Sequence, residues 1–289
     1  MRIMLLLSLF MMAGTCGSSR EPLPWDKERA LSDLKVLSQE PHPMGSPRIA
    51  VLSDYIEKEM QHQGLQTGRD RWTAQVPDPE LLGQEANPMR SMTLPIPLRN
   101  VYAKVKSGNE PCAFLVTSHY DSKRLVEGPG IGANDSGSSS VALLELMRGI
   151  KTRDLKLRCH IVAVWFDGEE AYLPEWRDGQ TRHPSRIVDN TYGSRHLVDN
   201  LQACDKGFCL PASWGGEKVE GMVLLYMVGM PDLKLTPDVN STRTLLDLTY
   251  NNLILGSTGS TTYALPNASQ MTLSGALTIS GGTLRVSNA

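Results

Sequence analysis

The strongest constraint on the fold is a repeated pattern in which an apolar, strand-like run ends directly in a polar motif. Residues 113–117 lead into Ser-His-Tyr-Asp-Ser at 118–122, and residues 160–166 lead into Asp-Gly-Glu-Glu at 167–170. The second run contains β-branched residues and suits a strand that is buried on both faces. Helical patterns alternate with such runs, so we expect an α/β fold whose functional groups lie at the carboxyl ends of parallel strands.

Hydrophobic periodicity indicates the remaining elements. Helices are expected at residues 27–65, interrupted by a Pro-rich loop at 40–47, and at 141–150 and 192–201. Strands are expected at 100–105, 113–117, 160–166 and 221–228, the last of them buried, whereas the Pro-rich residues 71–98 suggest irregular structure or edge strands. Together these elements predict a three-layer sandwich with a mostly parallel central sheet flanked by helices.

The start of the chain has the pattern of a secretory signal peptide over residues 1–19. Arg2 precedes an apolar run at 3–13, and small residues follow it. The run is too short to span a bilayer. Cys16 stands where a bacterial lipoprotein carries its lipid, so a lipid anchor is a second possibility. We expect an exported protein (periplasmic, extracellular or lipid-anchored) whose α/β domain covers residues 24–255.

Residues 256–289 are expected to form a separate tail. They are rich in Ser, Thr and Gly and contain short phrases that look like rungs of a β-solenoid. Two rungs cannot bury a core by themselves. We therefore expect the tail to be disordered or to lie along the domain as an edge strand.

Export would make the cysteines beyond the leader available for disulfides. Cys204 and Cys209 enclose four residues and could close a small loop, and Cys112 and Cys159 each begin an apolar run and could bridge adjacent strands. Four cysteines allow three sets of pairs, and the sequence leaves the choice open.

The charge balance argues against a nucleic-acid partner. The chain has 29 Lys and Arg against 31 Asp and Glu, a net charge of −2, and so lacks the basic surplus of nucleic-acid binders. The leader is the one apolar run of notable length, so we also expect no transmembrane span.

Three polar motifs carry groups that could work together. His119 follows the first strand, Asp135 lies in a loop at 132–137, and Glu169 and Glu170 follow the second strand. Each motif alone is typical of a structural role, such as a turn or a solvated pair. At one edge of a sheet they would converge, and imidazole and carboxylate ligands suit Zn²⁺. One glutamate could then bind the metal while its neighbour acts as a general base.

These motifs, in this order, resemble a known family. Pro-Met-Gly-Ser-Pro at 43–47, His-Tyr-Asp-Ser-Lys at 119–123 and Gly-Ala-Asn-Asp-Ser at 132–136 are similar to motifs of the co-catalytic zinc aminopeptidases. Phe-Asp-Gly-Glu-Glu-Ala at 166–171 and Tyr-Gly-Ser-Arg-His at 192–196 look like the glutaminyl-peptide cyclotransferase branch of that superfamily. The resemblance covers residues 41–255. It implies a phosphorylase/hydrolase-like α/β fold, a zinc cofactor, and peptide or protein N-termini as substrates.

The resemblance also implies roles for individual residues. Asp135 would be the bridging or central metal ligand, and Glu170 would bind the zinc ion that is retained in the one-zinc members. His119 matches the ligand of the second metal in the two-zinc peptidases, whereas the one-zinc cyclotransferases do not use it as a ligand. Glu169 matches the catalytic acid/base.

The resemblance also implies two residues of a substrate pocket and a reaction. Trp176 and Tyr192 would line the substrate pocket by resemblance, although packing is an equal alternative. The implied reaction is the conversion of N-terminal glutaminyl residues to pyroglutamate with release of ammonia. The alternative is an aminopeptidase in which Glu169 activates a zinc-bound water, and a second alternative is a truncated or inactive member.

Two departures from the family pattern concern the metal site. Tyr226 stands where the family has an Asp, and no histidine follows His196, although the family places its last zinc-binding His well after this strand. Asp135 and Glu170 are then two ligands where a catalytic zinc normally has three protein ligands. We therefore expect that the family's C-terminal third is missing and that the site is incomplete. Histidines 42, 62 and 160 are expected to be structural.

Overall fold

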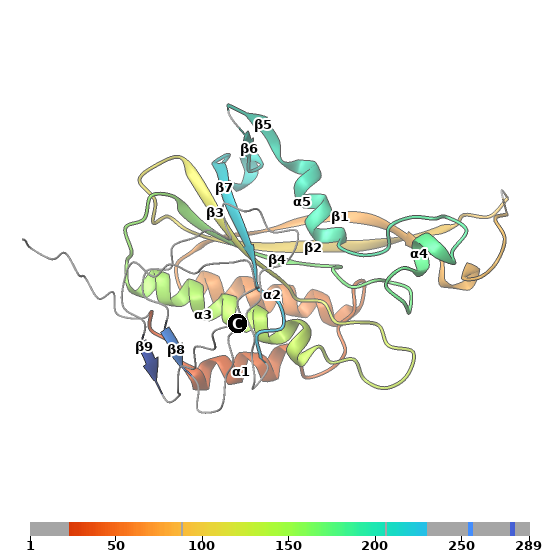
Figure 1. Cartoon of the computed structure of the whole chain (residues 1–289), viewed down its shortest axis with the longest axis horizontal. Coiled ribbons are helices and arrows are strands. Elements are labelled where there is room, and N and C mark those ends of the chain that lie inside the picture. The colour runs from red at the N-terminus through yellow and green to blue at the C-terminus, as the bar shows by residue number, and fades with distance from the viewer. Residues whose placement is uncertain (1–22, 88, 206, 230–253, 257–277, 281–289) are drawn as a thin grey trace, which may run out of the picture. The chain divides into compact units, whose positions relative to one another are not determined.

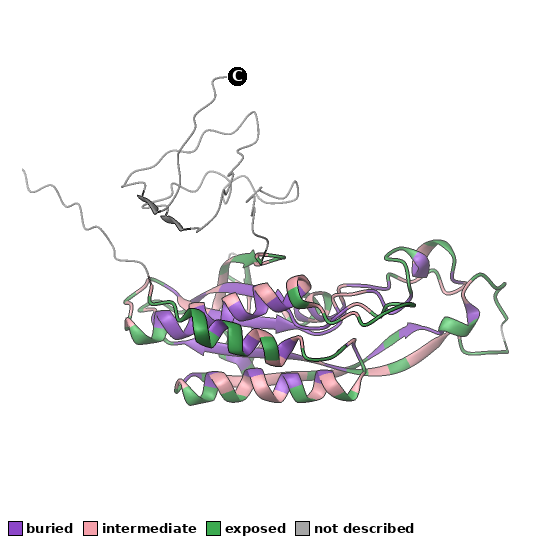
Figure 2. Cartoon of the chain, turned by 90° about the horizontal axis from the view of Figure 1, so that it is seen from below, coloured by how far each residue is buried: buried purple, intermediate pink, exposed green. Residues whose placement is uncertain are grey.

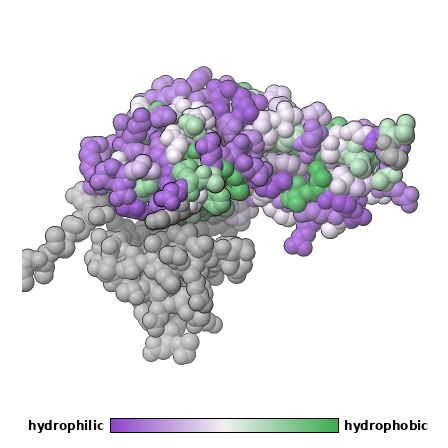
Figure 3. Space-filling view, turned by 90° about the horizontal axis from the view of Figure 1, so that it is seen from above, coloured by the Kyte–Doolittle hydropathy of each residue, from purple (hydrophilic) through white to green (hydrophobic). Residues whose placement is uncertain are grey.

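The computed structural model describes residues 23–87, 89–205, 207–229, 254–256 and 278–280. Leu23–Met230 form one compact unit. The expected leader with Cys16, and most of the expected tail, lie outside the described residues. Among the residues that are described, the helices are too short or too polar to cross a bilayer. The face of the molecule in Figure 3 is mostly hydrophilic, with a few separate apolar patches.

A seven-stranded sheet with the order β1-β2-β4-β3-β7-β6-β5 forms the centre of the compact unit (Figure 1). Its strands are β1 (Gln66–Pro77), β2 (Thr93–Val105), β3 (Cys112–His119), β4 (His160–Phe166), β5 (Gln202–Cys204), β6 (Gly207–Cys209) and β7 (Lys218–Leu224). Strand β3 pairs in parallel with β4 and β7, and the other pairs are antiparallel. The α/β class is confirmed, but the sheet is mixed and is parallel only at its centre, because hairpins build both of its edges.

The Pro-rich region forms most of a long antiparallel hairpin, and β1 is the edge strand of the sheet. Strand β4 pairs with β2 only at residues 101–105, so the part of β2 before residue 101 has a neighbour on one side only. Pro95 and Pro97 lie in this part and are two residues apart, so both ring nitrogens face the same side. The register with β1 is continuous through both prolines. Proline is therefore tolerated here because its missing N–H faces the edge that β4 does not reach.

Three helices cover one face of the sheet: α1 (Lys27–Leu37), α2 (Pro47–His62) and α3 (Ser139–Thr152) (Figures 1 and 2). The Asp26 side chain accepts the N–H of Arg29 at the start of α1, and Ser46 caps α2 directly before Pro47. The apolar sides of these helices pack on β2, β3 and β4 around the fully buried Trp165. The expected helical region at 27–65 is confirmed, with a loop between its two helices.

A buried ionic network ties the three helices together. Arg148 of α3 forms ion pairs with Asp33 of α1, with Glu59 of α2 at 2.6 Å and with Glu145 of α3 at 2.7 Å. Arg29 also pairs with Glu145 at 2.7 Å. Because the Arg148 side chain is buried, its charge is offset by these carboxylates rather than by water.

The opposite face of the sheet carries α5 (Tyr192–Asn200) and a short turn after β6. Leu197 of α5 packs with Leu210 and Trp214 against the strands, and the Trp214 ring stacks on Tyr102 at 4.2 Å between centroids. Helices or turns therefore cover both faces, and the expected three layers are present. The smaller elements are η1 (Pro79–Leu81), η2 (Ala133–Ser138), α4 (Asp178–Thr181) and η3 (Ala212–Trp214).

Both disulfides follow the pairs that strand positions and spacing suggest. Cys112 at the start of β3 bonds Cys159, which directly precedes β4, and Cys204 bonds Cys209 across the β5–β6 hairpin. The first bond joins the amino ends of two parallel neighbours. The structure thereby selects one of the three possible sets of pairs.

Strand β7 is less buried than its apolar sequence predicts. It runs over Lys218–Leu224, and Met222 and Leu224 keep 46% and 52% of their surface exposed. Strand β6 pairs with β7 only at Lys218, so the rest of β7 has β3 as its partner on one side. An apolar run indicates a buried strand only if both of its neighbours extend along it, which is not the case among the described residues.

Two short strands lie in the C-terminal part of the chain. They are β8 (Ile254–Gly256) and β9 (Thr278–Ser280), and they pair in parallel with each other. The segment that was expected to be disordered or an edge strand therefore contributes the strand β9 to this small pair.

Candidate functional site

The expected functional groups converge at the carboxyl ends of two parallel strands. His119 is the last residue of β3 and lies opposite Phe166, the last residue of β4. Glu169 and Glu170 follow β4 after one turn, in which Gly168 adopts a φ of +69°. Asp135 lies in η2, and its carboxylate accepts a hydrogen bond from His119 Nε2 at 2.9 Å. The edge-of-sheet prediction is therefore confirmed for His119 and Asp135.

Asp121 organises this edge, although its position in the sequence predicted no role for it. Its side chain is fully buried. One carboxylate oxygen accepts His119 Nδ1 at 3.3 Å and the backbone N–H of Glu169 at 3.1 Å, and the other accepts the N–H of Glu170 at 3.1 Å. A carboxylate on the second nitrogen of a histidine fixes the ring orientation, as is common behind metal-binding histidines. The one available signal is its position two residues after His119.

His119 lies between two carboxylates. Burial by itself lowers the pKa of an imidazole, but the hydrogen bonds to Asp121 and Asp135 and the charge of Glu169 raise the pKa of His119 to about 10. Its Nε2 lies 3.9 Å from the Glu169 carboxylate. Without a metal ion, His119 is therefore a cation that partly offsets the surrounding acidic groups.

The loop around Asp135 is held by serine hydroxyl groups. The Ser136 and Ser140 hydroxyls donate to the carbonyl oxygen of His119, the second at 2.6 Å. The peptide bond between Asp135 and Ser136 is cis. Burial would raise the pKa of Asp135, but hydrogen bonds from His119 and Tyr226 hold it below its usual value. Asp135 is consequently an ionised acceptor in this site.

The two glutamates are unusually basic. Burial is the largest cause for each, and the negative charges of Asp121 and Asp135 act in the same direction. His119 lowers both values but does not cancel the effect, and the pKa of each glutamate is raised to about 7. A carboxyl group with a pKa near neutrality can both accept and donate a proton, which is the property of a general acid/base.

Tyr226 enters the site from the segment after β7. Its hydroxyl donates to the second carboxylate oxygen of Asp135 at 2.9 Å, and its ring stacks on His119 at 5.9 Å between centroids. The residue that stands in place of the family's Asp therefore occupies an oxygen atom of Asp135. Burial and the charge of Asp135 raise the pKa of Tyr226, so this phenol is a neutral donor.

The two aromatic residues assigned to the substrate pocket lie in different surroundings. Trp176 is 42% exposed in the loop after the glutamates. Tyr192 begins α5 and is buried; its hydroxyl donates to Asp189 at 2.7 Å, and the Arg195 guanidinium lies over its ring. The described contacts of Tyr192 are therefore internal to the protein, whereas Trp176 is open to a ligand.

The donor set matches zinc in its chemistry but not in its arrangement. His119, Asp135 and Glu170 offer imidazole and carboxylate donors of the kind that zinc takes. Within the described parts of the chain, however, no three His, Cys, Asp or Glu side chains are grouped as a metal ion requires. The hydrogen bond from Tyr226 occupies one oxygen of Asp135. The residues present therefore fit zinc in kind, and a complete ligand set is not formed by them.

Three of the other histidines have structural contacts. His160 Nδ1 accepts the N–H of Gly108 at 3.0 Å, and the buried His183 bonds the carbonyl oxygen of Asp78 at 3.0 Å. His42 is buried next to the site and bonds the carbonyl oxygen of Glu40.

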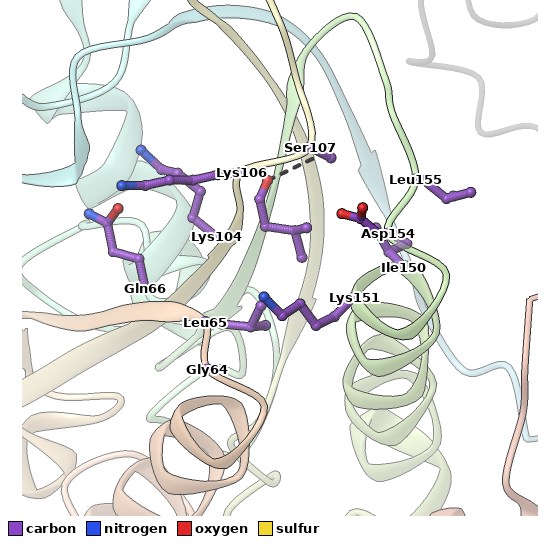
Figure 4. A pocket seen from close by; sticks show the side chains of 11 residues that line it. Gly64, Leu65, Gln66, Lys104, Lys106, Ser107, Ile150, Lys151, Asp154 and Leu155 are labelled. Atoms are coloured by element: carbon purple, nitrogen blue, oxygen red, sulfur yellow. Dashed lines mark hydrogen bonds between the residues drawn. The ribbon is translucent and has the colours of Figure 1, made fainter.

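A cavity of about 280 Å³ lies away from these groups (Figure 4). It lies between the turn before β1, the end of β2 and the end of α3, and its lining includes Leu65, Ser107 and Lys151. Because the end of β2 pairs with the start of β4, the cavity lies at the opposite end of the strands from His119. The candidate site is therefore separate from it.

A family model and a curated relative match this chain. The family model of Peptidase family M28 matches residues 100–266. A glutaminyl-peptide cyclotransferase of Dictyostelium discoideum is 32% identical over 133 residues, which are 44% of this chain and 34% of that protein. The chain therefore spans about a third of the length of this relative.

Two solved structures share the fold. A glutaminyl cyclase of an Acidobacteriales bacterium superposes with a TM-score of 0.59 at 24% identity, covering 81% of this chain and 70% of that one. A Zn-dependent exopeptidase of Parabacteroides distasonis superposes with a TM-score of 0.54 at 17% identity, covering 78% and 70%. At such identities the likeness establishes the common α/β fold.

Proposed function

The chain belongs to peptidase family M28, and from this membership we propose that it is a zinc-dependent glutaminyl-peptide cyclotransferase. Its substrates would be peptides or proteins with N-terminal glutamine, converted to pyroglutamate with release of ammonia. The relative from Dictyostelium discoideum, which carries that name, supports this choice within the family. So do the motifs at 166–171 and 192–196.

The observation that carries the proposal is the state of Glu169. Its backbone N–H is fixed on the buried Asp121 at 3.1 Å, its carboxylate lies 3.9 Å from His119 Nε2, and its pKa is raised to about 7. The cyclisation needs one group that takes a proton and later returns it. A pKa near the working pH allows the same carboxyl group to do both.

We assign to Glu169 both the acceptance of the proton and its return to the leaving group. The α-amino nitrogen attacks the γ-carbonyl carbon of the glutamine side chain, and Glu169 takes the proton that this nitrogen loses. Glu169 then gives the proton to the side-chain nitrogen as the bond between that nitrogen and the carbonyl carbon breaks. One ring C–N bond forms, one amide C–N bond breaks, and ammonia leaves.

Zinc is part of the proposal through Asp135 and Glu170, with His119 beside them. The neighbour named a Zn-dependent exopeptidase and the donor types support zinc. A bound zinc ion would supply polarisation of the γ-carbonyl. The side chains of the site would hold the substrate nitrogen near Glu169. The exposed Trp176 is the proposed contact for the peptide.

An aminopeptidase is the second candidate, because the matching family model is that of a peptidase family. Glu169 would then take a proton from water instead of from an amine. We further propose that the chain is exported through residues 1–19, with a lipid on Cys16 as the variant of this proposal. The N-terminal sequence and mass of the mature protein from its native host test both points.

The decisive experiment uses the whole chain supplied with zinc. Ammonia release from a glutaminyl peptide and hydrolysis of a leucyl peptide are measured side by side, with Glu169→Gln as the matched control. Cyclisation that Glu169→Gln lowers by about 10²- to 10⁴-fold supports the cyclotransferase. Leucyl hydrolysis alone supports the aminopeptidase. If neither substrate is turned over, both enzymatic proposals fail and the inactive alternative stands.

A further inference from the structure

The segment that carries the two glutamates lies outside the helices and strands. Residues 169–173 follow β4 as an irregular stretch. Backbone polar groups in such a stretch need partners other than a strand ladder. Thr191 N–H donates to the carbonyl oxygen of Glu169 at 2.8 Å, and Tyr192 N–H donates to that of Gly168 at 2.7 Å. Residues 171–173 are instead held by two charged side chains.

Lys123 holds the carbonyl side of these three residues. Its ammonium group donates to the carbonyl oxygen of Ala171 at 2.7 Å and to that of Leu173 at 2.8 Å. Lys123 follows Asp121 by two residues, and Asp121 holds the N–H groups of both glutamates. The loop after β3 therefore fixes the glutamate segment at two successive points.

Asp189 holds the amide side of the same three residues. Its carboxylate accepts the N–H of Tyr172 at 3.2 Å and the N–H of Leu173 at 2.8 Å, as well as the Tyr192 hydroxyl at 2.7 Å. Asp189 is fully buried. Space around it is restricted, because a Cβ atom added at Gly179 would lie 2.6 Å from the Asp189 Cβ. Asp189 therefore has one well-defined position, with three donors directed at it.

We propose that Lys123 and Asp189 are a pair of positioning residues, which clamp residues 171–173 from opposite sides and so hold Glu169 and Glu170 in register with His119 and Asp135. The expected effect of this pair on the reaction rests on the proposed function. The ammonium and the carboxylate also attract each other electrostatically. Hydrogen bonds to charged groups are the stronger kind, so an irregular segment gains a rigidity that neutral side chains would not supply.

The clamp has a specific consequence for the glutamates. Ala171 is bonded to Glu170 through the chain, so a shift of the Ala171 carbonyl moves the Glu170 backbone. Asp121 holds the other end of the same short stretch. Loss of either clamp residue should therefore displace the glutamates while the sheet and its helices remain in place.

The test uses Asp189→Asn and Lys123→Met in the full chain, singly and together. Asparagine keeps the size of Asp189 but directs an N–H₂ group at one of the two amides. We expect kcat for the glutaminyl peptide to fall by about 10- to 100-fold with little change in KM, as for other residues that orient active groups through a second contact. The double variant should lose no more than the worse single one, because the pair acts as a unit. Lys123→Arg, which keeps two donors, should recover most of the activity.

Amide hydrogen exchange gives a readout that does not depend on turnover. In the clamp variants, the protection of the Tyr172 and Leu173 amides should fall, while protection in β3 and α3 stays the same. Asp33→Asn is the matched control, because it removes a buried carboxylate from the helix network and should leave kcat and the exchange at 172 and 173 unchanged.

Each outcome decides the proposal. Unchanged exchange at 172 and 173 in both clamp variants would overturn it, and so would a loss of activity that follows only a general fall in protection. If Asp189→Asn fails to fold, Gly179→Ala replaces it, since the added methyl group displaces Asp189 without changing its charge. A wild-type chain that turns over no glutaminyl peptide would defeat the proposed function, whereas the exchange experiment would still decide the clamp.

Discussion

The Tyr226 hydroxyl donates a hydrogen bond of 2.9 Å to the Asp135 carboxylate, so the residue found in place of a family acid contacts the proposed central ligand. A phenol is a poor zinc ligand at neutral pH, and burial with the nearby Asp135 charge raises its pKa further. The Tyr226 hydroxyl thus occupies one carboxylate oxygen of Asp135 and does not supply a zinc ligand in place of the family's Asp. This contact accounts for part of the mismatch between the donor set and zinc.

Tyr226→Asp should therefore increase the affinity for zinc. The substitution frees one oxygen of Asp135 and places a third carboxylate beside it, so we expect at least about a tenfold tighter Kd. The measurement is competition with a chromophoric chelator at a fixed pH. Tyr226→Phe is the control, because it frees the oxygen without adding a donor and should change the Kd much less. Equal affinities for Tyr226→Asp and wild type would show that this position does not face the metal.

The metal-free protein should lose stability as the pH rises. The pKa values of Glu169 and Glu170 are raised to about 7 from 4.5, and that of His119 is raised to about 10 from 6.5. All three groups bind protons more tightly in the folded state than in the unfolded state. By linkage, the free energy of unfolding then falls from about pH 4.5 to 7 through the glutamates and on towards about pH 10 through His119.

Urea unfolding of the chelator-treated protein at a series of pH values measures this slope. The Glu169→Gln, Glu170→Gln double variant should flatten the part between about pH 4.5 and 7, and it should shorten the part above it because the Glu169 charge no longer raises the pKa of His119. Zinc should reverse the trend in the wild type, because it offsets the carboxylate charges. A stability that rises between pH 5 and 7 without metal would contradict the assignment of these groups.

The strand ends, and with them the location of the site, could be predicted from the sequence. The runs that end at Thr117 and Phe166 are apolar enough to mark buried strands, and parallel neighbours bring their ends together. His119 and Asp135 follow from that argument. For residues 71–98 the sequence left irregular structure and edge strands as alternatives, and β1 is an edge strand. The long β1–β2 hairpin was not predicted, because Pro95 and Pro97 oppose a strand unless their nitrogens face an unpaired edge, and the sequence does not show which edge is unpaired.

The residues that support the site were harder to predict, because their partners are distant in the sequence. Asp121 accepts N–H groups 48 and 49 residues away, and Lys123 reaches carbonyl groups 48 and 50 residues away. Asp189 lies in a polar loop where a carboxylate is ordinary. Each of these roles depends on the fold that brings the loops together, so a local sequence pattern does not specify it.

Removal of the Cys112–Cys159 bond should cost more stability than removal of the Cys204–Cys209 bond. The first closes a loop across a sequence separation of 47 residues and the second across 5. The chain-entropy argument gives roughly 4 kcal/mol for the first and roughly 2 kcal/mol for the second. Paired Cys→Ser variants compared by urea unfolding test the order. An equal or reversed order would indicate that strand contacts already restrict the unfolded chain.

Asp167→Asn should stabilise the protein at neutral pH. Asp167 is fully buried; its Oδ2 accepts the Arg99 N–H at 3.0 Å, and its Oδ1 has no hydrogen-bond partner among the described residues. Burial and the nearby Asp121 charge raise its pKa well above the usual value. The folded state therefore binds this proton more tightly than the unfolded state, and stability is lost as the pH rises above the unfolded value of about 4.

Asparagine keeps an acceptor for Arg99 and removes the charge that has to be either buried or protonated. We expect a gain of about 1 kcal/mol or more in the free energy of unfolding at pH 7, and a smaller gain at pH 5, because the stability that the raised pKa of Asp167 removes grows as the pH rises above the unfolded value. Asp121→Asn is the matched control: it makes the same change on a carboxylate that accepts two backbone N–H groups and His119, and it should destabilise the protein. Urea unfolding at the two pH values measures both variants. If the gain for Asp167→Asn is larger at pH 5 than at pH 7, Asp167 is ionised in the folded protein. Its charge is then balanced by a group other than its neighbours in this structure.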